Sequence, residues 1–575
     1  MNKKLSALIS IALLAAMLLG ACAAPAAGIS PRGAEGRGDV APFDALEYVR
    51  PDAAAMAARV EELEGLLAAG AGAEDAAPLL EACIDDYNGA VSMYNLARIR
   101  YFADMTDEYY EREYAACADV IYSFDQAVER LYTACARSPV AGELERAYFW
   151  EGFAEEYGGD DAARYTDEVV ALYQREGELL GEYYALIAAP EIVIDGVTVD
   201  YREYLAAADA QDYARAVEEY TRQYNSRLGN IYISLIRVRR ELAEKLGYDS
   251  YEQMQYEAFA RDYTPAQAEA LLRDICEYIV PDSYAAAQME VIAGAEYYPM
   301  SEGRLLDAVG TAAARIGGLA DEAYSRMREY GYYDVALRAN KSEMSFTSFL
   351  YAAEMPFVFV APYGDTEDIL TLAHEFGHFL DEYCNYACEV ARSLDFEELF
   401  SQAMECLVME RLEGVLDAAE LDSLRRIKLL SVLDTYVVQS SYAEFESRVY
   451  ALSDEALTLD AVNAISLEMA KKYGYYDGES EELYAMGWTE ISHFYEAPFY
   501  VISYVVSLDG ALQLYELERA QPGAGLEKYM ALLPFDGVEL VEALERAGLE
   551  SPFSAGRAQA AAALIFADAA AESAA

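Results

Sequence analysis

Apolar residues recur at helical spacing over most of this 575-residue chain, and this periodicity restricts the fold more than any other feature. One stripe, whose steps of three and four residues place its members on one helix face, consists of Met56, Val60, Leu63 and Leu67. A later helix is predicted over residues 231–246, and Gly247 is well placed to end it. We therefore predict a mainly α protein.

Two short segments have strand character instead. The pair Asp195-Gly196 separates two β-branched runs, which is the pattern of a two-residue β-hairpin. We place a seam here, between an N-terminal helical region (42–190) and a second region (191–575) with an Ala-rich tail from about residue 555. The run Phe357–Val360 lies between two prolines, which predicts an edge strand because proline has no backbone donor.

The N-terminus has the pattern of a targeting segment. Two lysines precede an uncharged apolar stretch from Leu5 to Ala21, and Cys22 follows. This resembles a bacterial lipoprotein signal, which implies removal of residues 1–21, a lipid on Cys22 and a flexible tether over 22–41. An ordinary cleaved signal or an N-terminal membrane anchor is the alternative. We expect an extracytoplasmic protein, anchored by lipid at the cell surface or in the periplasm.

Charge and cysteine content exclude several classes of protein. A formal net charge of −59 argues against nucleic acid as a partner and against docking through a basic face onto anionic lipid. After Cys22, seven cysteines remain, an odd number without zinc-ribbon spacing. Cys384 and Cys388 are one helical turn apart, which is poor disulfide geometry. We predict no disulfide framework.

Two of only three histidines lie in the segment His374-Glu375-Phe376-Gly377-His378. Thr366-Glu367-Asp368 precedes it and is typical of a helix start. On a helix, His374 and His378 project from the same face and can share a zinc ion. Glu375 lies beside them and is the candidate general base. The alternative is a coincidental pair of surface histidines.

A zinc site needs a third protein ligand, and Glu397 and Glu398 are the candidates downstream. Glu405 discriminates between them. Seven residues separate Glu398 from Glu405, which is about 700° of helical rotation and leaves both within about 20° of one face. From Glu397 the two carboxylates would lie about 80° apart. If Glu405 supports the site through a hydrogen bond, Glu398 is the better ligand.

These residues resemble the thimet oligopeptidase and oligoendopeptidase F family of zinc peptidases. The likeness rests on the histidine motif and on Glu398, Ser401 and Glu405; Leu242–Tyr251 and Arg261–Thr264 resemble the oligoendopeptidase branch. It covers roughly residues 190–520. The resemblance implies two helical lobes around a deep substrate channel, a small sheet beside the zinc-binding helix, one Zn²⁺ per chain, and cleavage of short peptides within a catalytic domain over 191–575.

The third histidine lies in a late segment that resembles the family's. There the resemblance implies that His493, Tyr500 and Tyr504 bind the substrate and the oxyanion formed during attack. Glu375 would take a proton from the attacking water and pass it to the leaving amine. One departure is Asp381, where family members often have another histidine.

The strand at Phe357–Val360 could pair with an extended peptide and position it. The leading hypothesis is a monomeric, lipid-anchored zinc endopeptidase acting on short peptides. Two alternatives remain: a zinc dipeptidyl- or carboxypeptidase of related fold, and a non-catalytic peptide-binding lipoprotein. The presence of Glu375 argues against the second, because a pure binder has no use for a general base.

Overall fold

The structure is a computed structural model. It describes residues 40–574 except 150–152, 159–165, 188–189, 202–203, 206–209, 282–294, 386–392, 479 and 536–537. The predicted signal segment, Cys22 and nearly all of the predicted tether lie outside the described residues, as does Cys388. Among the described cysteines, Cys83, Cys117, Cys135 and Cys276 are free thiols.

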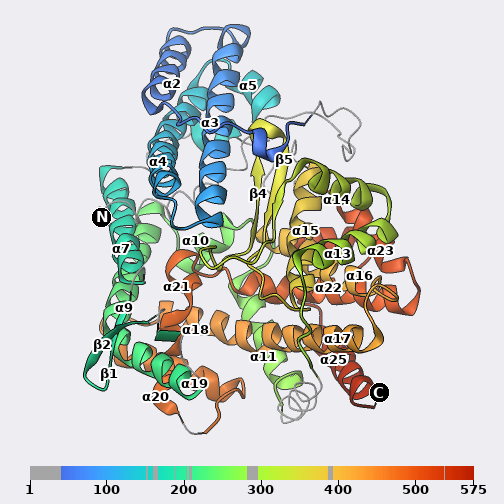
Figure 1. Ribbon diagram of the computed structural model, residues 1–575. Helices are drawn as coiled ribbons and strands as arrows, with labels where there is room; N and C mark the ends of the chain where they lie inside the picture. The colour runs from blue at the N-terminus through green and yellow to red at the C-terminus, as the bar shows by residue number, and fades with distance from the viewer. Residues whose placement is uncertain are drawn as a thin grey trace.

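The first helices form a lobe with its own hydrophobic core at one end of the molecule (Figure 1). After a short turn, η1 (Phe43–Ala45), these are α2 (Ala53–Ala68), α3 (Ala73–Ala103), α4 (Glu108–Arg137), α5 (Ala141–Tyr148) and α6 (Phe153–Gly158). The buried residues of α2 are the four of the predicted stripe. The prediction for this helix is therefore confirmed, and the stripe packs against α3 and α4.

The predicted hairpin is confirmed. Strands β1 (Glu191–Ile194) and β2 (Val197–Asp200) pair antiparallel, and Asp195 and Gly196 both have positive φ, as a two-residue type I′ turn requires. Around it, α7 (Asp167–Ile187) packs along the long helix α9 (Ala210–Leu246), which ends before Gly247 at φ +87°. The seam near residue 190 stays a prediction. The packing joins α7 to the second, larger core.

The second core contains most of the remaining chain, which confirms the mainly helical fold. The elements that follow α9 along the chain are α10 (Tyr251–Ala258), α11 (Pro265–Tyr278), α13 (Glu302–Ile316), α14 (Gly318–Tyr330), β3 (Tyr333–Asp334), β4 (Phe346–Leu350), η3 (Tyr351–Ala353), β5 (Met355–Phe359), α15 (Asp368–Asn385), α16 (Leu394–Met409), α17 (Ala418–Asp434), the π-helical turn η4 (Thr435–Gln439), α18 (Ser440–Tyr450), α19 (Leu459–Lys472), α20 (Glu481–Met486), η5 (Gly487–Glu490), α21 (Ser492–Glu496), α22 (Ile502–Ala520), α23 (Ala524–Leu532), α24 (Leu540–Ala547) and α25 (Arg557–Ala574). The Ala-rich tail is thus largely the helix α25, which packs against α17 and α11.

The three-stranded sheet has the order β3-β5-β4, so the prediction of an edge strand at Phe357–Val360 is wrong. Strand β5 is central, parallel to β3 and antiparallel to β4. Pro356 can lie in this central strand because of its position in the hydrogen-bond pattern. The N–H groups of Val358 and Val360 point toward β3. The nitrogen of Pro356, two residues before Val358, faces the same side, but β3 does not extend that far. The missing N–H of Pro356 therefore costs the sheet no hydrogen bond.

Strand β4 is one of the two outer strands of this sheet and lies between α3 of the first lobe and α15 of the second core (Figure 1). From α3, Asn95 Nδ2 donates to the carbonyl oxygen of Phe349 at 3.0 Å. The Arg98 guanidinium stacks on the ring of Phe346, 3.8 Å from its centroid. The first lobe therefore covers part of an edge that would otherwise be open.

Helices α15 and α16 pack closely, and α22 also packs against α16. Gly377 permits the close approach, since a Cβ at this position would lie 2.5 Å from Ser401 Cα and 2.7 Å from the carbonyl oxygen of Phe400. A glycine in mid-helix usually weakens the helix, so its use here indicates a packing requirement. Within the described residues, no helix is both long and apolar enough to cross a bilayer.

Candidate metal centre

The structure brings together the three predicted metal ligands, two on α15 and one on α16. One ligand atom from each of His374, His378 and Glu398 can be chosen so that all three lie within 4.8 Å of one another. Glu398 Oε2 is 3.5 Å from His374 Nε2, and its Oε1 is 4.0 Å from His378 Nε2. The alternative ligand Glu397 is not in this group. Two imidazoles and one carboxylate are a donor set suited to zinc.

A buried chain of charged groups orients His374. Its Nδ1 lies 2.9 Å from Glu405 Oε1, and Lys428 Nζ on α17 donates to Glu405 Oε2 at 2.8 Å. Burial alone would raise the pKa of Glu405. The positive charge of Lys428 and the hydrogen bond with His374 outweigh burial, so the pKa is lowered. An ionised Glu405 accepts a hydrogen bond from Nδ1–H, which leaves Nε2 directed at the ligand cluster.

The electrostatics of the cluster favour a cation. Burial alone would lower the pKa of His374, but its hydrogen bond to Glu405 and the nearby carboxylates outweigh burial and raise the pKa to about 9. His378 has the opposite shift, since burial and the charge on His374 lower its pKa to about 3. A site whose carboxylates hold a proton on one imidazole also stabilises a divalent cation, which would displace that proton on binding.

Glu375 lies beside the ligands and is buried. Burial raises its pKa to about 7, although the His374 charge and a hydrogen bond act in the opposite direction. The hydrogen bond comes from Thr347 on β4, whose hydroxyl lies 2.9 Å from Glu375 Oε2 and 2.9 Å from its backbone oxygen. A carboxyl with a pKa near neutrality is suited to take and return a proton.

The late segment reaches the same cluster. Tyr500 donates from its hydroxyl to Glu398 Oε1 at 2.8 Å, and the Tyr504 hydroxyl lies 3.4 Å from His493 Nε2. The rings of all three residues are in contact, with centroids 5.1 to 6.0 Å apart. Burial lowers the pKa of His493, so its imidazole is neutral near pH 7. Asp381, a departure from the family resemblance, is buried and accepts a hydrogen bond from Asn385.

Sequence reasoning missed two residues that bind the carboxyl groups beside this cluster: Thr347 binds Glu375, and Lys428 binds Glu405. Thr347 lies in a segment without any motif, so nothing in the sequence marked it. Lys428 had a signal: it is a lysine inside the apolar stretch Ile427–Leu430 of a strongly acidic chain. A buried cation of that kind requires a buried anion as partner, and Glu405 is that anion.

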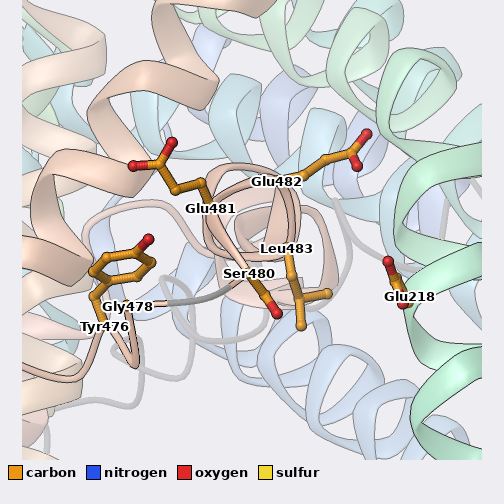
Figure 2. Close-up of a pocket in the computed structure, with 7 residues that line it drawn as sticks. All are labelled: Glu218, Tyr476, Gly478, Ser480, Glu481, Glu482 and Leu483. Atoms are coloured by element: carbon orange, nitrogen blue, oxygen red, sulfur yellow. The ribbon is translucent and has the colours of Figure 1, made fainter.

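An open acidic pocket lies elsewhere, at α9 and α20 (Figure 2). Its carboxylates are already paired: Arg222 binds Glu218 and Glu482, and Lys471 binds Glu481. None of the ligand cluster lines this pocket. It is therefore a separate surface feature and not the candidate site.

A mainly helical fold with two histidines and a glutamate around a buried carboxyl defines the site type of a metallopeptidase. Comparisons with known proteins agree. Residues 313–561 match the model of peptidase family M3, and residues 43–154 match the peptidase M3 N-terminal domain. The chain belongs to peptidase family M3. The second match nearly coincides with the separate core of the first lobe.

Individual relatives are distant. Oligopeptidase PepF of Bacillus subtilis (strain 168) is 24% identical over 241 residues, which are 39% of this chain and 34% of PepF. The matched part thus spans about a third of that relative. A solved structure assigned to an oligoendopeptidase F superposes with a TM-score of 0.77 at 21% identity, covering 93% of this chain and all of that one. PZ peptidase A, solved with an inhibitor, gives 0.76 at 20% identity, covering 92% of this chain and 99% of that one.

Proposed function

We propose that the protein is a zinc-dependent oligoendopeptidase that hydrolyses short peptides outside the cytoplasm. One observation carries the proposal: Glu375, with a pKa of about 7, lies beside a His374–His378–Glu398 cluster that fits a zinc ion. Family membership supports a metal-dependent peptidase. The names of the similar proteins, an oligopeptidase and an oligoendopeptidase, favour short peptides as substrates.

The residues divide the chemistry as follows. His374, His378 and Glu398 would hold the zinc, which when bound supplies Lewis acidity for water and for the scissile carbonyl. Glu375 accepts a proton from the attacking water and returns it to the leaving amine. Tyr504, with His493 and Tyr500 beside it, donates a hydrogen bond to the oxyanion. Glu405 and Lys428 keep the His374 ring in its binding orientation.

Strand β4 is the better candidate for positioning the substrate now that β5 is known to be central. Thr347 on β4 binds Glu375 directly, so a peptide paired beside this residue would pass next to the general base. Main-chain pairing gives affinity with little demand on side chains. Substitution of Thr347 by proline is expected to raise KM for peptides of every sequence.

The N-terminal segment supports the proposed location. A charged start, an apolar stretch and Cys22 are the features of a lipoprotein signal, so we propose a lipid on Cys22 and work outside the cytoplasm. We expect a monomer. Metabolic labelling with a radioactive fatty acid tests the anchor: wild-type protein should be labelled, and the Cys22→Ser variant should not.

The enzymatic proposal is tested on the soluble part, from about residue 42. Zinc content is measured together with cleavage of an internally quenched peptide, for the wild type and for Glu375→Gln. We expect one zinc in both and a loss of kcat in the variant of about 10²- to 10⁴-fold. Glu61→Gln, on an exposed part of α2, is the matched control and should behave as the wild type.

Turnover in both forms, or in neither with zinc present, would overturn the proposal. A peptide blocked at both ends separates the alternatives within the class, because only an endopeptidase cuts it. A zinc-loaded protein that binds this peptide without cutting it would instead support the non-catalytic binder.

A further inference from the structure

The segment between α21 and α22 contains a strained turn. The Tyr500 N–H donates to the carbonyl oxygen of Ala497 at 3.1 Å, which closes a four-residue β-turn with Pro498 and Phe499 at its centre. Phe499 has φ +65°. Proline followed by a positive-φ residue is the pattern of a type II turn, where the second position is normally glycine. A phenylalanine is unfavourable in this conformation and persists only if its surroundings enforce it.

Two buried side chains, one carboxyl and one guanidinium, hold the peptide groups on either side of Phe499. Glu446 on α18 accepts the Phe499 N–H at Oε1, at 2.9 Å. Arg261, from the connection between α10 and α11, donates through Nη2 to the Phe499 carbonyl oxygen and to Ser503 Oγ, both at 2.8 Å. Glu446 and the Arg261 side chain are fully buried. A second buried cation, Arg239, binds the backbone oxygens of Phe494 and Tyr495 just upstream.

The turn determines where Tyr500 lies. Tyr500 directly follows the held residue, and its hydroxyl donates to Glu398 Oε1 at 2.8 Å. Arg261 also contacts the helix that supplies Glu398, since its Nε lies 3.5 Å from Asp395 Oδ2 in the first turn of α16. The Arg261 guanidinium therefore contacts both the turn before Tyr500 and the helix that carries Glu398, the hydrogen-bond partner of Tyr500.

We propose that Arg261 and Glu446 are positioning residues for the metal centre: they hold Phe499 in its left-handed conformation and thereby set the Tyr500 hydroxyl against Glu398. Neither residue touches the ligand cluster through its own side chain. Their effect on catalysis rests on the proposed peptidase function, but their effect on the place of Tyr500 does not.

The first test compares variants at Glu446. Leucine removes the acceptor for the Phe499 N–H, whereas glutamine keeps an acceptor oxygen of the same reach. We expect Glu446→Leu to lower kcat about 10- to 100-fold with KM and zinc content unchanged, because small misplacements of a catalytic group are costly. Glu446→Gln should stay within about twofold of the wild type. If Glu446→Leu fails to fold, Arg261→Lys should show the same pattern, because lysine keeps the charge but lacks the planar guanidinium with its several donors.

A double variant distinguishes positioning from general damage. If Glu446 acts through Tyr500, adding Glu446→Leu to Tyr500→Phe should change kcat by less than about twofold. A second full loss in the Tyr500→Phe background would overturn the proposal. So would an equal loss in Glu446→Gln and Glu446→Leu, which would show that keeping an acceptor oxygen at this position does not preserve the turn.

The third measurement does not use activity. With 3-fluorotyrosine at position 500, the ¹⁹F resonance should shift on Glu398→Gln in the wild type and lose that response with Glu446→Leu. An unchanged response would contradict the positioning role. If the wild type binds zinc but cuts no peptide, the proposed function fails, while the ¹⁹F response still decides whether Arg261 and Glu446 place Tyr500.

Discussion

Lys428 Nζ lies 2.8 Å from Glu405 Oε2, and Glu405 joins this buried pair to the metal ligand His374. The other oxygen of Glu405 lies 2.9 Å from His374 Nδ1. Both members of the pair are less than 10% exposed. Loss of the lysine would leave Glu405 as an uncompensated buried carboxylate, which favours its protonation and weakens its hold on the imidazole.

We therefore predict that Lys428→Met lowers zinc affinity about 10- to 100-fold, the usual range when a group behind a metal ligand is removed. Zinc competition with a chelating dye measures this. Lys471→Met is the control, because Lys471 forms an exposed pair with Glu481 far from the cluster. Equal zinc affinity in the two variants would contradict the role of the buried pair.

The hydroxyl of Thr347 should set the acid limb of the pH profile. Its hydrogen bond to Glu375 stabilises the carboxylate and lowers a pKa that burial has raised to about 7. Removing the bond in Thr347→Val raises that pKa, so the rise of kcat/KM with pH should move to higher pH. Thr347→Ser keeps the hydroxyl and should keep the wild-type profile. Identical acid limbs for valine and serine would count against this hydrogen bond.

Gly377 controls the spacing between the helices that carry the ligands. A methyl group here meets the backbone of Ser401 and Phe400 at 2.5 to 3.0 Å, and backbone cannot move aside as a side chain can. Gly377→Ala should therefore separate α15 from α16, weaken zinc binding and lower Tm. Gly65→Ala, at an open position in the last turn of α2, should instead stabilise the protein by about 0.5–1 kcal/mol. Calorimetry with and without zinc checks both variants.

Tyr504 is predicted to act on the transition state and not on the metal. Its hydroxyl contacts His493 and none of the ligands, whereas Tyr500 binds Glu398. Tyr504→Phe should lower kcat about 10²- to 10³-fold with unchanged zinc content. Steady-state kinetics combined with zinc analysis measures this. A variant that loses zinc together with activity would assign Tyr504 to the metal site instead.

Glu446 makes stability depend on pH. Burial raises its pKa from 4.5 to about 8, so between these values the folded state holds a proton that the unfolded state has released. The free energy of unfolding must then fall as pH rises through this interval and level off above it. Glu446→Gln does not titrate, so its stability relative to the wild type should grow between pH 5 and 8. Urea unfolding at a series of pH values measures the difference, and a constant difference would refute the assignment.

Local spacing predicted the parts of the site that lie on single helices. The separation of His374 from His378, and of Glu398 from Glu405, places side chains on one helix face wherever the helix lies in the fold. These four residues indeed meet in the structure. The resemblance to relatives added His493 and the two tyrosines, which no helical spacing connects to α15.

Contacts between distant segments could not be predicted in this way. Lys428 reaches Glu405 from another helix, and Thr347 reaches Glu375 from a strand. The neighbours of a strand are likewise decided by tertiary packing, which is why β5 was predicted to be an edge and is central. Arg261 was noticed only as part of a resemblance, because its contact with Phe499 bridges 238 positions.

The cover that α3 provides for β4 has a consequence for any attempt to reduce the protein to its metal-binding half. Without the first lobe, the backbone of Phe349 would lose its Asn95 partner and Phe346 would lose the Arg98 that stacks on it. A fragment truncated in this way would present a bare, aromatic strand edge to its neighbours in solution. We expect such a fragment to form intermolecular sheets and precipitate, even if its metal ligands remain intact.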